Sequence, residues 1–198
     1  MSRTHWAPGT GHCRVARYSA QMSYLQRLID YNSWANRGML EFLAALPEET
    51  LDLRAAGVYG SIRETLDHLL SSEISYHRRL LGGSAPSGPR PEKPDIAFLL
   101  GQARESAAAL AGIAERLPAA ETLLPLSDGN RSAATMLTQL LLHGCEHRAH
   151  VGTILGANGI EPPDIDAWAH GILAGNDDWP AEWGAEPADR GVLHWGKG

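Results

Sequence analysis

Residues 135–159, TMLTQLLLHGCEHRAHVGTILGANG, decide the fold of this chain. Apolar residues recur through the stretch at helical spacing, and Gly159 is a typical helix stop. His143 and His147 are four residues apart, so on a helix their imidazoles lie about 40° apart and one turn along. Two neutral nitrogen ligands for a divalent metal are commonly presented in this way. The stretch therefore predicts a helix from about Ser132 to Ala157 that carries two metal ligands.

The surroundings of the histidine pair favour a position facing a core. Leu140, Val151 and Ile154 lie toward the same side of the helical wheel as His143. A buried imidazole needs partners, which favours metal binding over the alternative of a polar pair on a solvated face.

The candidate for a third ligand is His68, in the stretch SIRETLDHLLSSE. Taken alone, His68 would more often be a core or interface histidine with a satisfied ring nitrogen. It lies about 7 residues into its helix, whereas the pair lies about 13 residues into the later one. At about 1.5 Å per residue, the depths differ by roughly 9 Å if both helices start level. An offset or tilt between the helices is needed to close that gap.

Three further long helices are predicted. The apolar spacing indicates one helix from Ser23 to Leu46, one from Ser61 to Leu81 and one from about Asp95 to Leu117. Ser61 begins the sequence S-I-R-E, which predicts a capping box with Glu64. Residues 82–94 hold four prolines and three glycines and read as a linker. With no convincing strand and a short extra helix over 164–173, the prediction is an all-α four-helix bundle.

The domain organisation follows from where the periodicity begins and ends. Residues 1–21 lack a sustained period and read as a loose leader, so Met22 is an alternative start of translation. Residues 22–175 form the bundle. Residues 176–198 carry too many prolines, glycines and acids for a regular element and are expected to be an irregular tail.

Composition excludes several classes of function. The chain has 198 residues, two cysteines and a net charge of -6. Two cysteines exclude a disulfide framework, and the absence of a basic stripe argues against nucleic acid as a partner. No apolar run approaches the roughly 20 residues that span a bilayer, and the N-terminus lacks a secretory signal. The expectation is a cytoplasmic protein that acts on a small molecule.

Two neighbours of the pair, His150 and Glu146, are candidates for supporting roles, whereas a third, Cys145, is not. His150 lies too far along the helix for an easy shared metal, but its side chain leans back toward the site and could donate to a ligand ring or shuttle a proton. Glu146 is either an acid or base near the metal or a solvated residue. Cys145 is expected to face away from the histidines as a small apolar filler.

The same residues also match H-x-x-E-H, the signature of inverted zinc peptidases, in which the glutamate is the general base. That enzyme would take its third ligand from a downstream carboxylate, for which Glu161, Glu182 and Glu186 are available. Two amphipathic helices of a bundle fit a site of three histidines better than a site of two histidines and a downstream carboxylate.

Together, three stretches of the chain resemble the DinB/YfiT-like family of small bundle metalloproteins. They are YNSWANRGML at 31–40, GSIRETLDHLL at 60–70 and LLLHGCEHRAHVGTIL at 140–155, the last followed by GIEPPDID. The resemblance implies a mirror variant of the up-and-down four-helix bundle, a divalent metal held by His68, His143 and His147, and often a homodimer. Relatives often carry histidine at the position of Glu146, and Arg-Gly-Gln where this chain has residues 148–150, so the resemblance does not carry the substrate over.

The function that these observations predict is activation of a thiol or of water at a three-histidine metal. Zinc and nickel both suit imidazole ligands. The family includes thiol S-transferases and an isomerase that use low-molecular-weight thiols such as bacillithiol or mycothiol, and a hydrolase would use the same site. The alternatives are a non-catalytic metal-binding stress protein and the peptidase.

Overall fold

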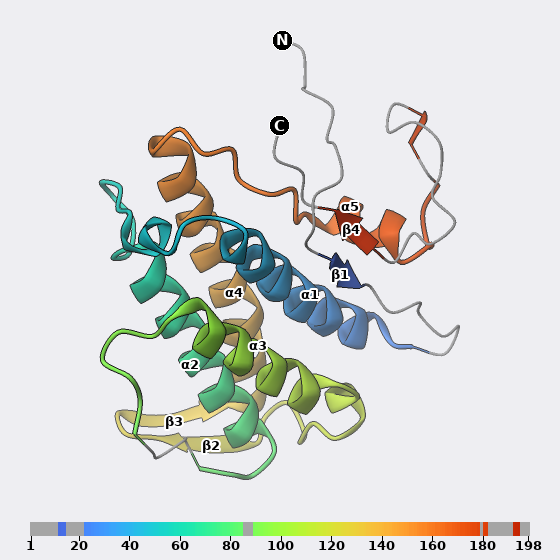
Figure 1. Cartoon of the computed structure of the whole chain (residues 1–198). Helices are drawn as coiled ribbons and strands as arrows, with labels where there is room; N and C mark the ends of the chain where they lie inside the picture. Colours follow the sequence, from blue (N-terminus) through green and yellow to red (C-terminus); the bar gives the residue numbers. More distant parts are fainter. Residues whose placement is uncertain (1–11, 15–21, 85–88, 179, 182–191, 195–198) are drawn as a thin grey trace.

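The computed structural model describes residues 12–14, 22–84, 89–178, 180–181 and 192–194. Its framework is a bundle of four long helices with one short extra helix (Figure 1), which confirms the predicted fold class. The elements are α1 (Tyr24–Ala44), α2 (Ile62–Leu80), α3 (Ile96–Leu110), α4 (Ala133–Ala157) and α5 (Ala167–Leu173).

The helices are arranged in a ring in which α1 contacts α3 and α4, and α2 contacts α3 and α4. One hydrophobic cluster joins the start of α2, at Ile62 and Leu66, to the end of α4, at Ile154 and Leu155. Another joins Leu80, at the end of α2, to the start of α4. Helices α2 and α4 therefore run antiparallel, as Figure 1 also shows.

Each long helix begins at a capping residue that the sequence contains at the right place. The side chains of Ser23, Ser61, Asp95 and Ser132 each accept a hydrogen bond from the backbone amide three residues later. The predicted capping box is confirmed, because the Ser61 amide also donates to the Glu64 carboxylate at 2.6 Å. These caps set where α1, α2, α3 and α4 start.

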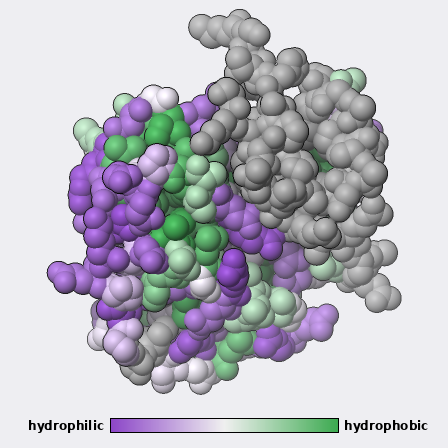
Figure 2. All heavy atoms as spheres, viewed as in Figure 1, coloured by the Kyte–Doolittle hydropathy of each residue, from purple (hydrophilic) through white to green (hydrophobic). Residues whose placement is uncertain are grey.

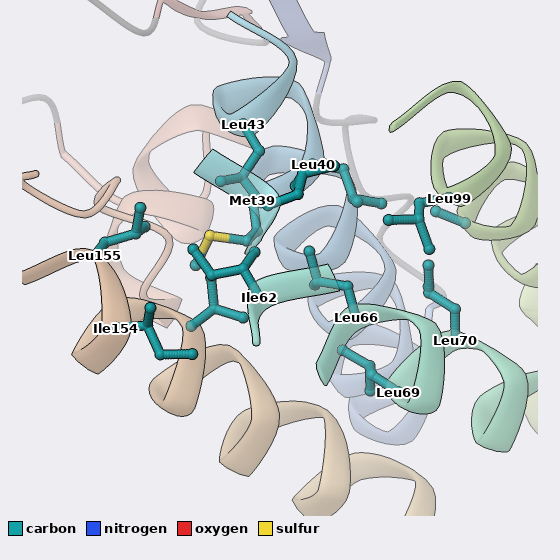
Figure 3. Packing of buried hydrophobic residues seen from close by; sticks show 13 residues of the cluster. Met39, Leu40, Leu43, Ile62, Leu66, Leu69, Leu70, Leu99, Ile154 and Leu155 are labelled. Atoms are coloured by element: carbon teal, nitrogen blue, oxygen red, sulfur yellow. The ribbon is translucent and has the colours of Figure 1, made fainter. Parts of the chain in front are cut away.

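The core between the helices is built from leucine, isoleucine and methionine. Figure 3 shows side chains from all four long helices converging, with Met39 and Leu40 of α1 meeting Leu66 of α2, Leu99 of α3 and Ile154 of α4 in one cluster. Each of these residues is at most 2% exposed. This apolar contact holds the ends of α2 and α4 together on one side of the candidate site.

Two short antiparallel strand pairings among the described residues were not predicted. Strands β2 (Leu123–Leu126) and β3 (Gly129–Ser132) pair antiparallel immediately before α4, with Leu126 opposite Gly129. A pair of four-residue strands leaves too little alternation for a period to be recognised. Gly129 adopts a φ of 121°, which a residue with a side chain rarely adopts. The turn-rich segment before α4 is therefore a hairpin.

The second pairing joins the two ends of the described chain. Strand β1 (His12–Arg14) is antiparallel to β4 (Val192–His194). These strands lie inside the leader and the tail that were expected to be irregular, and pairing between segments so far apart leaves no local signal in the sequence. The remainder of the expected leader over 1–21, and most of the tail over 176–198, lie outside the described residues.

Hydrophilic and hydrophobic residues alternate over the face seen in Figure 2, where an interrupted hydrophobic band runs between hydrophilic areas. Among the described residues, no helix combines the length and the apolar character needed to cross a membrane.

Candidate metal centre

Three histidine side chains from two helices meet between α2 and α4. Nε2 of His143 lies 3.1 Å from Nε2 of His68 and 3.0 Å from Nε2 of His147. Among the histidine, cysteine, aspartate and glutamate side chains of the described residues, these three form the one group with the spacing of metal ligands. Their ligand atoms all lie within 4.8 Å of one another. Tetrahedral bonds of 2.0–2.1 Å would place ligand nitrogens about 3.4 Å apart, close to these separations. The three rings thus converge as a ligand set for one divalent ion.

The helix geometry explains how His68 reaches the pair. The depth difference of roughly 9 Å assumed that the two helices start level. Helices α2 and α4 instead run antiparallel, and the start of α2 at Ile62 shares a hydrophobic cluster with Ile154 and Leu155, which lie before the end of α4 at Ala157. This offset along the helix axes brings His68 toward the turns of α4 that carry His143 and His147. His143 and His147 are buried and His68 is half-buried, which places the cluster at the seam where the two helices meet the surface.

The surroundings of His143 and His147 favour the neutral form of both imidazoles. Burial, together with the neighbouring His147 and His68, lowers the pKa of His143 from 6.5 to about 4. Burial and the nearby His68 and His150 also lower the pKa of His147, while Glu146 acts in the opposite direction. A neutral imidazole at neutral pH offers its lone pair without first losing a proton, as a metal ligand must.

Two tyrosines border the cluster. The ring of Tyr59 stacks on His68 with centroids 4.8 Å apart and meets the edge of His147 at 5.3 Å. Tyr76 of α2 presents its ring edge-on to His143 at 6.0 Å. Tyr59 belongs to the loop before α2, where its carbonyl accepts a hydrogen bond from Thr65. Stacking of this kind restrains the orientation of the His68 ring.

The residues proposed to support catalysis lie beside the cluster rather than in it. His150 is half-buried, its ring is 5.4 Å from that of His147, and its Nδ1 is buried without a hydrogen-bond partner in the described structure. Glu146 is exposed on α4. Of the carboxylates available to a peptidase, Glu161 is exposed and outside the cluster, whereas Glu182 and Glu186 are not among the described residues.

Cys145 faces away from the histidines, as predicted, but it is not a buried filler. It is exposed, and its sulfur accepts a hydrogen bond from Nη2 of Arg148 at 3.4 Å. It helps to line a pocket of about 320 Å³ between α1, α4 and the segment before α5, together with Tyr31 and Ile165. This pocket lies on the side of α4 opposite the histidines, because Cys145 is about 200° around the helix from His143.

Behind the cluster, four polar side chains form a buried bridge, here called the amide bridge: Asn32, Asn36, Glu73 and Arg148. Both asparagines donate their amide nitrogens to Oε2 of Glu73, Asn36 at 3.0 Å. Both accept from Nη1 of Arg148 through their amide oxygens, Asn32 at 2.8 Å and Asn36 at 2.6 Å. The four residues are at most 5% exposed. Two amides of α1 therefore connect a carboxyl group of α2 to a guanidinium of α4.

The carboxyl group of the amide bridge has every oxygen occupied. Ser106 of α3 donates to Oε1 of Glu73, so all four long helices contribute to the hydrogen bonding. Burial raises the pKa of Glu73, and the hydrogen bonds from Ser106 and Asn32 and the charge of Arg148 lower it.

Sequence reasoning missed the amide bridge and the two tyrosines. A signal for the bridge was present, since Asn32 and Asn36 recur four residues apart on the apolar side of α1 and Glu73 interrupts the apolar stripe of α2. Polar residues in an apolar stripe are buried only with partners. Tyr59 lies in a loop, where no period relates it to His68.

The comparisons with known proteins agree with this architecture. The model of the DinB family matches residues 21–178. A DinB-like protein from Bacillus subtilis, YjoA, has a similar crystal structure, with a TM-score of 0.56 and 15% sequence identity over 73% of this chain and 99% of that chain. At this identity the likeness concerns the fold alone. No curated protein matches the sequence. Since the family model spans most of the chain, the chain belongs to the DinB family.

Proposed function

We propose that this protein is a metal-dependent enzyme in which His68, His143 and His147 hold a divalent cation that activates a thiol or water. The observation that carries the proposal is the convergence of three Nε2 atoms from two helices, with neighbouring pairs 3.0–3.1 Å apart. Three protein ligands leave a tetrahedral ion with an open position, which is typical of catalytic rather than structural zinc sites. Zinc and nickel both suit these ligands.

The position of the cluster supports a catalytic role. His68 is half-buried and Tyr59 is 44% exposed, so the cluster lies close to solvent at the edge of the bundle. A divalent cation bound there would supply the positive charge that stabilises a thiolate or hydroxide at neutral pH.

The chain itself supplies groups that handle the proton. Nδ1 of His150 is buried without a partner beside His147, and it is our first candidate to accept the proton that the thiol or water releases. The exposed carboxylate of Glu146 is the second. The expected reaction is an S-transfer, a hydrolysis or an isomerisation of a small molecule, with a low-molecular-weight thiol as co-substrate. A homodimer and a cytoplasmic location remain predictions.

The test is metal analysis joined to turnover assays. Purified protein offered zinc, nickel, manganese and iron should retain one equivalent of metal, measured by elemental analysis. The loaded protein should then consume electrophiles in the presence of one member of a panel of small thiols. His68→Ala should lose the metal, whereas His150→Ala should keep the metal and lose turnover. Failure of the wild-type protein to retain any metal would refute the proposal.

The same assays separate the rival functions. A peptidase would keep its metal in His68→Ala and lose activity in Glu146→Gln. A non-catalytic metal protein would bind one equivalent but show no turnover, and its cobalt form would give no spectral change with azide or thiols because its coordination would be closed.

A further inference from the structure

The amide bridge joins the two helices that carry the candidate ligands. Glu73 lies on α2, five residues after His68, and Arg148 follows His147 directly on α4. Neither of these charged side chains contacts the imidazoles in the hydrogen bonds described above. They are instead connected to each other through Asn32 and Asn36 of α1. In addition to their direct packing, α2 and α4 are thus connected through a third helix.

Close packing supports the same connection. Gly144 lies between the two histidines of α4, and a Cβ on it would be 2.2 Å from Oδ1 of Asn32 and 3.0 Å from Nη1 of Arg148. Helix α4 therefore approaches the bridge at a position that only glycine permits. Any shift of α4 along its axis would break the contacts to both asparagines, because each amide meets two partners in fixed directions.

We infer that Asn32, Asn36, Glu73 and Arg148 act as positioning residues, which set the register of α4 against α2 so that the three imidazoles meet at one point. This inference rests on the proposed function in so far as the meeting point serves a metal.

Physical reasoning favours positioning over simple stabilisation. Buried ionic groups are frequently no more stabilising than apolar side chains of similar volume, because removing charges from water is expensive. Leucine contacts between helices tolerate small displacements, whereas directed hydrogen bonds do not. A single buried polar contact is known to fix helix register in this way. The apolar core holds α2 and α4 together, and the amide bridge determines which of their turns face each other.

The experiment compares Asn36→Ala with a matched control, Gln26→Ala. Gln26 is also a buried amide of α1, but it bonds to Asp30, to the Leu110 carbonyl and to the Ala114 amide, away from α4. Arg148→Lys is the second variant, because it keeps the charge but not the two-pronged donation to the asparagines. All are measured as full-length proteins.

The first readout needs no metal. In chelator-treated protein, nuclear Overhauser contacts between the imidazole protons of His68 and His143 should be present in the wild-type and Gln26→Ala proteins. They should weaken or vanish in Asn36→Ala and Arg148→Lys. If both bridge variants retain these contacts, the inference is overturned, whatever their stability.

The second readout is cobalt binding. The visible spectrum of Co²⁺ reports the geometry of its ligands, and we expect an altered spectrum and about tenfold or greater loss of affinity in the bridge variants. Gln26→Ala should bind as the wild type does, even if its melting temperature falls equally. Wild-type protein that shows the ring contacts but binds no Co²⁺ would overturn the proposed metal function and leave the positioning role standing.

Discussion

His77 of α2 is a buried imidazole, 3% exposed, and both of its ring nitrogens lack hydrogen-bond partners in the described structure. A buried polar group without a partner costs about 1–3 kcal/mol. Burial also lowers the pKa of His77, with a further contribution from Arg78, so the ring is held neutral. His77 therefore lowers the free energy of unfolding, and no hydrogen bond of its ring within the described residues offsets this cost.

Replacing this histidine tests that statement. We expect His77→Leu to raise the free energy of unfolding by about 1 kcal/mol, because the unpaired nitrogens are removed while most of the volume is kept. Urea denaturation of both proteins in chelator gives the difference. The metal content of the variant should match that of the wild type, since His77 is outside the histidine cluster. A less stable variant would show that the ring has a partner that matters.

His170 gives a pH dependence of known sign. It packs against the rings of Tyr31 and Trp34, and burial lowers its pKa from 6.5 to about 4. As pH falls below about 6.5, the unfolded chain takes up the proton before the folded one, so stability is lost between pH 6.5 and about 4.

We therefore expect His170→Phe to lose less stability than the wild type between pH 7.5 and pH 5. Urea titrations at both pH values, with chelator present, provide the comparison, because the other histidines then contribute equally to both proteins. Equal losses in the two proteins would contradict the assignment of this pH dependence to His170.

At the scale of helices and strands, the sequence predicts starts better than ends. The starts of α1, α2, α3 and α4 follow from the caps at Ser23, Ser61, Asp95 and Ser132. The end of α3 does not, since α3 stops at Leu110, seven residues before the predicted end at Leu117. Gly112 adopts a φ of 66° there and ends the helix. Its neighbours are good helix formers, so the sequence predicts that the helix continues.

The candidate site shows the same division. The spacing of His143 and His147 needs one helix and was readable from local sequence alone. The sequence alone offered His68 as a candidate third ligand but could not show that it reaches the pair, because the relative direction and offset of α2 and α4 are tertiary properties. The amide bridge was not predicted, since its hydrogen bonds join residues that are between 37 and 116 positions apart.

Gly144 permits a test at the level of helix packing. Alanine in a helix interior is favoured over glycine by about 1 kcal/mol, but here its Cβ would overlap Asn32. We expect Gly144→Ala to lower the free energy of unfolding despite the better propensity. Gly152→Ala on the same helix is the matched control, because its Cβ would meet Pro162 at an ordinary 3.8 Å.

Thermal unfolding of the two variants provides the measurement. The control should be as stable as the wild type or more so. If Gly144→Ala were stabilised to the same degree as the control, the close approach of α4 to Asn32 would not limit the structure.

For the molecule as a whole, a metal held by α2 and α4 would link unfolding to binding. A ligand at 100 times its dissociation constant stabilises the folded state by about 2.7 kcal/mol. We expect zinc or nickel to raise the unfolding temperature of the wild type and of His150→Ala, and to leave His68→Ala unchanged. Thermal scans with metal and with chelator give the shifts. An equal shift in His68→Ala would place the metal elsewhere.

The rings of His68 and His143 touch although 75 positions of chain separate them. The proline-rich connection between α2 and α3 lies within that interval, so a protease cut there would leave His68 on the first fragment and His143 and His147 on the second. Neither fragment alone would hold the complete triad. Metal binding would then indicate that the two fragments had associated. The fold could therefore serve as a split reporter in which metal coordination is the signal.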